Sequence, residues 1–184
     1  MPDRLVGPRS ALGRLFVISP EFCRTMARYN AWQNKSLLRA AETLDDAALV
    51  EARGAFFGSI FGTFNHVLWG DTIWMARFAG WRKPKTSIPD SPKFTADWIR
   101  FKAARGDADS RIIRWADELT LNDLAGDLAW FSGALNANVQ KAKWLCVQHF
   151  FNHQTHHRGQ VHAMLTSAGA KPDDTDLFVM PGDL

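Results

Sequence analysis

Apolar residues recur three and four positions apart along four stretches of the chain, a spacing that places them on one face of an α-helix. The first stretch predicts a helix over residues 20–43, because Ser19 is a typical N-cap and Pro20 stands at the first helical position. The second predicts a helix that starts after Ser59 and ends at Gly80. Both helices therefore carry their own start signals, and the second also carries a stop signal.

Two more helices are predicted in the second half of the chain. Apolar positions predict a third helix over residues 94–119, with the aliphatic stem of Arg105 lying along the apolar seam. Residues 139–168 predict a long fourth helix, since no proline interrupts the pattern before Gly169 and Pro172 end it. Four long helices without strand alternation indicate an all-α fold, a four-helix bundle.

The segments between and beyond these helices lack a sustained period. Three prolines predict a long loop over residues 81–93. Residues 120–138 are expected to hold no helix beyond a turn, with a short extended segment as the alternative. Residues 1–18 are expected to form an N-terminal extension outside the core that is a candidate for disorder. Residues 173–184 predict an irregular C-terminal tail.

The composition supports a single domain, residues 19–184, and narrows its function. Hydrophobic residues make up 46% of the 184 positions, enough for one core. No apolar run approaches the roughly 20 residues of a membrane-spanning helix, and no signal peptide is convincing, so we expect a cytoplasmic protein. The 22 Lys and Arg are interleaved with 19 acidic residues, whereas nucleic-acid binding predicts basic clusters. Cys23 and Cys146 lack a Cys-x-x-Cys motif and are expected to be buried and free.

Five of the six histidines fall in one short segment, from His149 to His162. Two of them, His153 and His157, are four residues apart, so their side chains leave one face of the predicted fourth helix with Cβ atoms about 5–6 Å apart. The same spacing presents two zinc ligands in His-Glu-x-x-His proteases, but Gln154 here stands in place of the catalytic Glu. The pair therefore predicts a metal site that lacks the protease base.

His66 is the one histidine outside this segment, and it lies on the predicted second helix. Gly62 and Gly70 stand four residues before and after it on the same face, where the missing side chains leave space for a metal and a ligand. Together His66, His153 and His157 make a three-histidine set with open coordination positions, as in catalytic zinc sites.

The remaining histidines have other expected roles. His149 lies one turn before His153, where it is a fourth ligand, an alternative to His157, or a histidine that supports the ligands or belongs to the core; we favour the last. His156 and His162 point about 60° and 180° away from His153 at 100° per residue, so we expect them to face a partner or solvent.

Three segments of the sequence carry a family resemblance. They are residues 29–34 (Tyr-Asn-Ala-Trp-Gln-Asn), 65–71 (Asn-His-Val-Leu-Trp-Gly-Asp) and 152–160 (Asn-His-Gln-Thr-His-His-Arg-Gly-Gln). The chain resembles the DinB-like family in all three, and the last segment is the most specific. The resemblance covers nearly the whole predicted core, from about Ser19 to Pro181.

The resemblance implies a four-helix bundle in which three histidines hold a divalent metal, here His66, His153 and His157. Zinc or nickel is the expected ion, with iron or manganese as alternatives. Family members with assigned activities resemble transferases that use a low-molecular-weight thiol, or a mycothiol-dependent maleylpyruvate isomerase. We therefore expect a metal-dependent enzyme that acts on a small molecule, with a thiol-dependent S-transferase as the first hypothesis.

The sequence is also compatible with other functions. One is a non-catalytic metal-binding or small-ligand-binding protein of the stress response, and another is a metal-dependent hydrolase or isomerase. A DNA-associated stress protein ranks last, because the basic residues are dispersed. A bundle of this size with exposed aromatic residues is also expected to form a homodimer.

Polar and aromatic residues of the first predicted helix supply further candidates for the site. Asn30 and Asn34 share one helix face, with Tyr29 and Trp32 beside them. All four are candidate substrate contacts at the pocket wall. The alternative is that the aromatics belong to the core and the two amides bridge helices.

Two charged residues adjoin the motif histidines. Asp71 lies about 140° from His66 on an ideal helix, which makes it a doubtful metal ligand and a candidate partner for a hydrogen bond between helices. Arg158 follows His157 and either anchors an anionic group or pairs with an acid across the bundle. We favour the ion pair.

Overall fold

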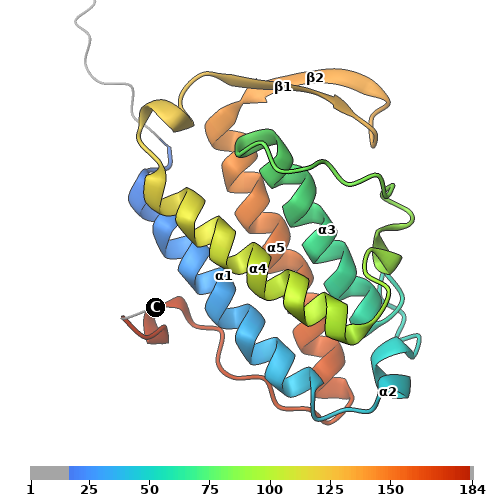
Figure 1. Cartoon of the computed structure of the whole chain (residues 1–184). Helices are drawn as coiled ribbons and strands as arrows, with labels where there is room; N and C mark the ends of the chain where they lie inside the picture. The colour runs from blue at the N-terminus through green and yellow to red at the C-terminus, as the bar shows by residue number, and fades with distance from the viewer. Residues whose placement is uncertain (1–16, 183–184) are drawn as a thin grey trace, which may run out of the picture.

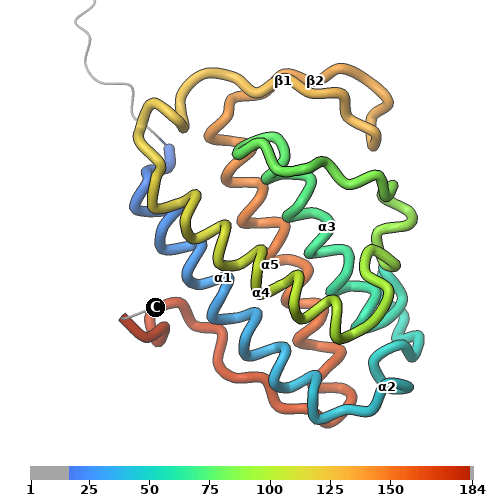
Figure 2. Tube along the Cα trace, in the orientation of Figure 1, coloured from blue at the N-terminus to red at the C-terminus, as the bar shows by residue number. Residues whose placement is uncertain are grey.

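The chain folds into a bundle of four long helices, as predicted. The computed structural model describes residues 17–182. The four helices are α1 (Pro20–Ala41), α3 (Ile60–Phe78), α4 (Trp98–Glu118) and α5 (Lys143–Ser167). α1 packs against α4 and α5, and α3 packs against the same two helices, so the four close around a common core (Figure 1). Figure 2 follows the same path as a Cα trace.

The first two long helices start where the sequence predicted. The Ser19 hydroxyl accepts a hydrogen bond of 3.2 Å from the amide of Phe22 at the start of α1. The Ser59 hydroxyl accepts one of 3.0 Å from Gly62 at the start of α3. Gly80 has a φ of +66°, a left-handed conformation that suits glycine and ends the helical path after α3.

α4 begins later than predicted. The carboxylate of Asp97 accepts a hydrogen bond of 2.8 Å from the amide of Arg100, so the helix starts at Trp98 and not at residue 94. Residues 81–97 hold only one short 3₁₀ turn, at Ser91–Lys93, which confirms the long loop.

Short elements complete the connections. α2 (Asp46–Val50) follows Asp45, whose carboxylate accepts a hydrogen bond of 2.8 Å from the amide of Ala48. Two further 3₁₀ turns lie at Asn122–Leu124 and Leu177–Val179.

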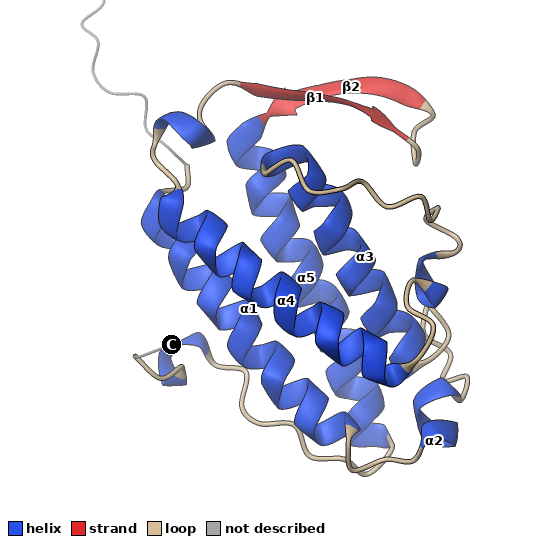
Figure 3. Cartoon of the chain, in the orientation of Figure 1, coloured by secondary structure: helices blue, strands red, loops and turns tan. Residues whose placement is uncertain are grey.

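A β-hairpin stands where the fourth predicted helix was expected to begin. β1 (Asp127–Ser132) pairs in antiparallel register with β2 (Ala137–Ala142), and the hairpin lies across one end of the bundle (Figure 3). The extended segment considered for this region is therefore present. Residues 139–142 pair with β1, so the helix predicted over them is wrong and α5 begins at Lys143.

The buried apolar side chains form two clusters along the bundle. One cluster, which includes Leu49 of α2, lies at the end where α3 begins, and the other includes Leu124 and lies toward the hairpin. Ile18 is buried in the second cluster, so core packing reaches into the last residue of the predicted extension. Residues 1–16 of that extension lie outside the described part of the chain.

Both cysteines are buried and free, as expected. Burial raises the pKa of the Cys23 thiol to about 12, so it stays protonated at neutral pH. Among residues 17–182, no helix has the length and hydropathy that a membrane span requires.

Apart from the 3₁₀ turn at Leu177–Val179, residues 173–182 of the C-terminal tail are irregular, as predicted, and residues 173–175 lie against α1. The amide of Asp173 donates to the Ser36 hydroxyl at 2.8 Å. The tail thereby forms one wall of a pocket that is described below.

Candidate metal centre

Three imidazoles from two helices converge in the bundle. His66 comes from α3, whereas His153 and His157 come from α5. One ligand nitrogen from each ring lies within 4.8 Å of the others, and the Nε2 atoms of His66 and His153 are 3.1 Å apart. The three residues that the sequence singled out are therefore brought together.

The packing of α3 against α5 creates this convergence. His153 and His157 are one helical turn apart, and their ring centroids are 4.5 Å from each other. Gly70 of α3 provides the space for His153, because a Cβ at this position would stand 2.7 Å from His153 Cε1. The expectation that Gly70 leaves room beside His66 is confirmed, and the group that fills the room is the ring of His153.

Gly62 serves a different purpose from the one expected. A Cβ at Gly62 would lie 2.4 Å from the backbone carbonyl oxygen of Phe57. The missing side chain therefore admits the loop before α3, and the prediction that it leaves space for the metal is wrong.

A serine from the loop after α3 fixes the proton on His66. The Ser91 hydroxyl donates to the carbonyl oxygen of Ile88 at 2.7 Å, so its oxygen accepts the hydrogen bond of 2.8 Å from His66 Nδ1. Nδ1 then carries the proton, and the lone pair of Nε2 faces the other histidines.

The orientation of His157 is fixed in the same way from within α5. Its Nδ1 lies 2.7 Å from the amide oxygen of Gln160, which can only accept. The Gln160 amide nitrogen lies 3.4 Å from His156 Nε2, which supports this orientation of the amide. His157 Nε2 is therefore free of a proton and available as a ligand.

Aromatic side chains enclose the centre. The ring of Phe57 stacks on His66, with centroids 3.6 Å apart, and meets His157 edge-on at 5.3 Å. Trp69 stacks on His66 from α3 at 5.7 Å. These rings keep water away from the imidazoles and lower the local dielectric constant.

Burial keeps the three imidazoles neutral. Together with the charge effect of the neighbouring imidazoles, it lowers the pKa of His66 and of His153 to about 3. Burial also lowers the pKa of His157, against the opposing effect of Gln160. Neutral imidazole is the form that coordinates a metal.

The donor set fits a divalent ion. Two nitrogens that each lie about 2.0–2.1 Å from one tetrahedral ion are about 3.4 Å apart, close to the separation of His66 and His153. Because His66 Nε2 has no proton, two facing nitrogens at 3.1 Å require a proton or a cation between them. Residues His66, His153 and His157 can therefore hold a metal ion.

The other histidines lie outside this cluster. The exposed ring of His149 packs edge-on against Trp74 at 5.1 Å and does not join the three-histidine group, so it is neither a fourth member of the cluster nor a core histidine. His156 is solvent-exposed, as expected, whereas His162 is half-buried and faces the pocket beside the C-terminal tail.

Asn30 and Asp71 belong to a buried hydrogen-bonded chain between helices. Asn30 of α1 donates to the side-chain oxygen of Gln154 of α5, and Gln154 donates to Asp71 of α3 at 2.8 Å. Asp71 is fully buried and is not part of the histidine cluster. Its expected role as a hydrogen-bond partner between helices is confirmed.

The same chain continues into α4. Arg105 pairs with Asp71 at 2.5 Å and with Asp109 at 2.8 Å. Asn34 of α1 donates to Asp109 at 2.9 Å. Asn30 and Asn34 thus bridge helices, which was the alternative to their role as substrate contacts, and Arg105 is a buried ion-pair partner in addition to an apolar stem.

Arg158 does not form the ion pair that we favoured. Its guanidinium is buried, with one hydrogen bond of 3.4 Å to Thr155 and the ring of Tyr29 at 5.5 Å. No carboxylate of the described residues lies within ion-pair distance of it, and burial lowers its pKa to about 10. Tyr29 lines the pocket beside Arg158, whereas the half-buried Trp32 packs on Tyr29 at 6.0 Å.

Sequence reasoning missed three residues of the centre. Gln160 carried a local signal, because it stands three residues after His157 on the same helix. Ser91 and Phe57 carried none, since both reach His66 from loops whose path the sequence does not specify.

Comparison with known proteins agrees with the geometry. The model of the DinB family matches residues 17–181, most of the chain. A search of curated proteins returns no match.

Proposed function

Because the chain belongs to the DinB family and gathers three neutral imidazoles at one point, we propose that it is a metal-dependent enzyme. His66, His153 and His157 are the proposed ligands. The observation that carries the proposal is the orientation of two imidazoles. Ser91 and Gln160 accept the Nδ1 protons of His66 and His157, so the Nε2 lone pairs of both rings point into the cluster.

We propose zinc or nickel as the ion, with iron or manganese as alternatives, since neutral imidazole suits several first-row metals. A divalent cation held by these residues would supply one chemical effect, a lower pKa for a thiol or a water molecule bound to it. Three protein ligands leave positions for such a molecule.

The first hypothesis for the reaction is transfer of a thiol. In this reaction a low-molecular-weight thiol loses its proton, its sulfur forms a bond to carbon of an electrophilic small molecule, and the leaving group departs with the electron pair. The chain contributes the three nitrogens, the tautomers fixed by Ser91 and Gln160, and the Phe57 ring that keeps water from His66. The family resemblance supports the thiol.

A water molecule in place of the thiol would make the protein a hydrolase, and the same ligand set serves an isomerase or a binding protein without turnover. These are the outcomes that the experiment separates.

The experiment is a screen of the purified, tag-free protein with a panel of thiols, electrophiles and esters. We expect thiol consumption that depends on the electrophile and is absent from His66→Ala. His149→Ala is the matched control, because His149 lies one turn from His153 but outside the ligand cluster. Ester hydrolysis without thiol consumption would assign the hydrolase, and bound metal without any turnover would overturn the enzyme proposal.

We also propose a cytoplasmic protein that takes a small-molecule substrate, binds no nucleic acid and forms a homodimer. The support for a dimer is apolar surface: Phe131 and Leu135 of the hairpin are 55% and 70% exposed. Light scattering that returns a mass near 20.7 kDa, the mass of one chain, would refute the dimer.

A further inference from the structure

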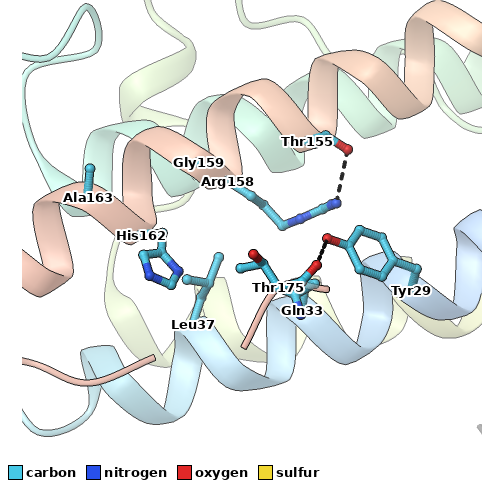
Figure 4. Close-up of a pocket in the computed structure, with 9 residues that line it drawn as sticks. All are labelled: Tyr29, Gln33, Leu37, Thr155, Arg158, Gly159, His162, Ala163 and Thr175. Carbon is cyan, nitrogen blue, oxygen red and sulfur yellow. Dashed lines mark hydrogen bonds between the residues drawn. The ribbon is translucent and has the colours of Figure 1, made fainter. Parts of the chain in front are cut away.

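A pocket separate from the histidine cluster lies between α1 and α5, on the side covered by the C-terminal tail. It has a volume of about 320 Å³, within the range of small-molecule sites. None of its lining residues is a histidine of the metal cluster. Figure 4 shows the residues that line it: Tyr29, Gln33, Leu37, Thr155, Arg158, Gly159, His162, Ala163 and Thr175.

Arg158 is the charged group of this pocket. Its side chain extends from α5 toward Tyr29 of α1 and is 5% exposed (Figure 4). Nη1 is buried and has no hydrogen-bond partner among the described residues, and Nη2 has only the long contact of 3.4 Å with Thr155. A buried guanidinium with an unused donor has lost its water without gaining an acceptor.

The nearest buried acids are already used by other groups. Asp71 forms an ion pair with Arg105 at 2.5 Å and accepts a hydrogen bond from Gln154 at 2.8 Å. Asp109 forms an ion pair with Arg105 at 2.8 Å and accepts a hydrogen bond from Asn34 at 2.9 Å. Both carboxylates act on Arg158 through space, but neither forms an ion pair with it within 4.0 Å. The described residues therefore offer Arg158 long-range charge balance and one long hydrogen bond, to Thr155, but no carboxylate acceptor.

The polar walls of the pocket are held in place by the tail. Tyr29 donates from its hydroxyl to the Thr175 carbonyl at 2.6 Å, and Gln33 donates to the Asp174 carbonyl at 2.9 Å. These two hydrogen bonds hold the tail against α1. They also use the donor groups of Tyr29 and Gln33, which are then not available to an occupant of the pocket. His162 Nδ1 is buried and has no hydrogen-bond partner among the described residues, so it is a second polar atom left for an occupant.

The rest of the lining is apolar. Leu37 of α1 and Ala163 of α5 contribute to the lining, together with the ring of Tyr29 (Figure 4). A guanidinium matches the planar, two-oxygen geometry of a carboxylate. An occupant that satisfies both parts of the lining has a carboxylate at one end and a compact hydrocarbon body at the other.

We propose that this pocket is a binding site for a small organic carboxylate, held by Arg158 at its charged end and by Leu37 and Ala163 along its hydrocarbon part. The site is separate from the three-histidine centre and does not depend on the proposed enzymatic function.

The test is calorimetric titration of the purified protein with benzoate and butyrate, each matched with its neutral amide. Benzoate and butyrate are expected to bind, and benzamide and butyramide are expected to bind at least about tenfold more weakly, because the charged hydrogen bond is lost. Arg158→Gln is expected to weaken carboxylate binding by about tenfold or more. Arg100→Gln is the matched control, because Arg100 is an exposed residue of α4 remote from the pocket lining.

A second variant keeps the test decisive if Arg158→Gln fails to fold. Ala163→Phe fills the pocket from the exposed face of α5 and leaves the guanidinium in place, so it is expected to abolish binding. His66→Ala is expected to retain it, which separates this site from carboxylate bound to a metal. The proposal is overturned if neither carboxylate binds, if the amides bind as tightly, if Ala163→Phe binds normally, or if His66→Ala loses binding.

Discussion

At the scale of single residues, the candidate metal centre depends on hydrogen bonds made by the far side of each imidazole. Ser91 and Gln160 accept the Nδ1 protons of His66 and His157, so both rings present Nε2 to the interior. Groups of this kind set the tautomer and the orientation of metal-binding histidines.

Ser91→Ala tests this role. The substitution removes the acceptor for His66 Nδ1, so the ring loses its preferred tautomer and orientation. We expect metal affinity to fall by about 10- to 100-fold with the fold intact. Ser87→Ala is the control, because the Ser87 hydroxyl bonds to the exposed Asp90 in the same loop and should leave metal affinity unchanged. Equal affinities for both variants in a chelator competition assay would contradict the assignment.

The acid stability of the metal-free protein follows from the same imidazoles. The folded-state pKa values of His66 and His153, about 3, lie below the ordinary value of 6.5. Their neutral forms therefore favour the folded state fully above pH 6.5, and this contribution is lost as the pH falls toward 3, because the unfolded chain binds protons that the folded chain excludes.

We accordingly expect the free energy of unfolding of the chelator-treated protein to fall from pH 6.5 downward. Denaturant melts across this range measure it. The free energy of unfolding should fall less steeply with decreasing pH in His153→Phe, because this variant lacks one of the titrating groups. A free energy that rises on acidification would be inconsistent with buried, neutral imidazoles.

The sequence was sufficient to identify the three histidines but not their supports. His153 and His157 are visible because helical geometry alone places residues four apart on one face. Ser91 stands 25 residues after His66 and Phe57 precedes α3 in a turn, and only the folded loops bring them to the ring. The Arg158 ion pair was predicted wrongly because the available acids pair with Arg105, a choice made by tertiary packing.

At the scale of elements, one buried polar network connects all four long helices. Asp71 of α3 accepts from Gln154 of α5 and Arg105 of α4, and Asn30 of α1 bonds to Gln154. Each partner arrives from a different helix, so the network requires one relative alignment of the four.

Asp71→Ala should destabilise the fold strongly. The variant leaves the buried Arg105 with Asp109 as its single carboxylate partner, and removing one member of a buried ion pair costs about 3–5 kcal/mol of unfolding free energy. The comparison is Lys102→Met, which breaks a partly exposed pair with Glu42 and should cost less than about 1 kcal/mol. Similar losses for both variants in urea unfolding would contradict a structural role of the network.

Helices were easier to predict than the hairpin. The start of α1 carries its cap at Ser19, a signal within a few residues of the event it predicts. The hairpin is stabilised by the pairing of β1 with β2 and by Trp130 of β1, which packs edge-on against Trp74 of α3 at 5.6 Å. Because this packing joins residues 56 positions apart, local periodicity could not place the boundary at Lys143.

At the scale of the whole molecule, the two sites occupy different sides of α5. His153 and His157 meet α3, whereas Arg158 and His162 face the pocket against α1 and the tail. One helix therefore supplies ligands to the candidate metal centre and the cation to the proposed carboxylate site. The single bundle follows from the helical periodicity, but the path of the tail across α1 does not, since residues 173–175 bond to α1 mainly through their backbone.

The most direct test of the account is the metal content of the protein purified without an affinity tag, measured by elemental analysis beside His66→Ala and His149→Ala. The account predicts about one divalent ion per chain in the parent protein and in His149→Ala, and almost none in a folded His66→Ala. A parent protein without stoichiometric metal after incubation with zinc or nickel, or a His66→Ala that retains the full complement, would contradict the central claim.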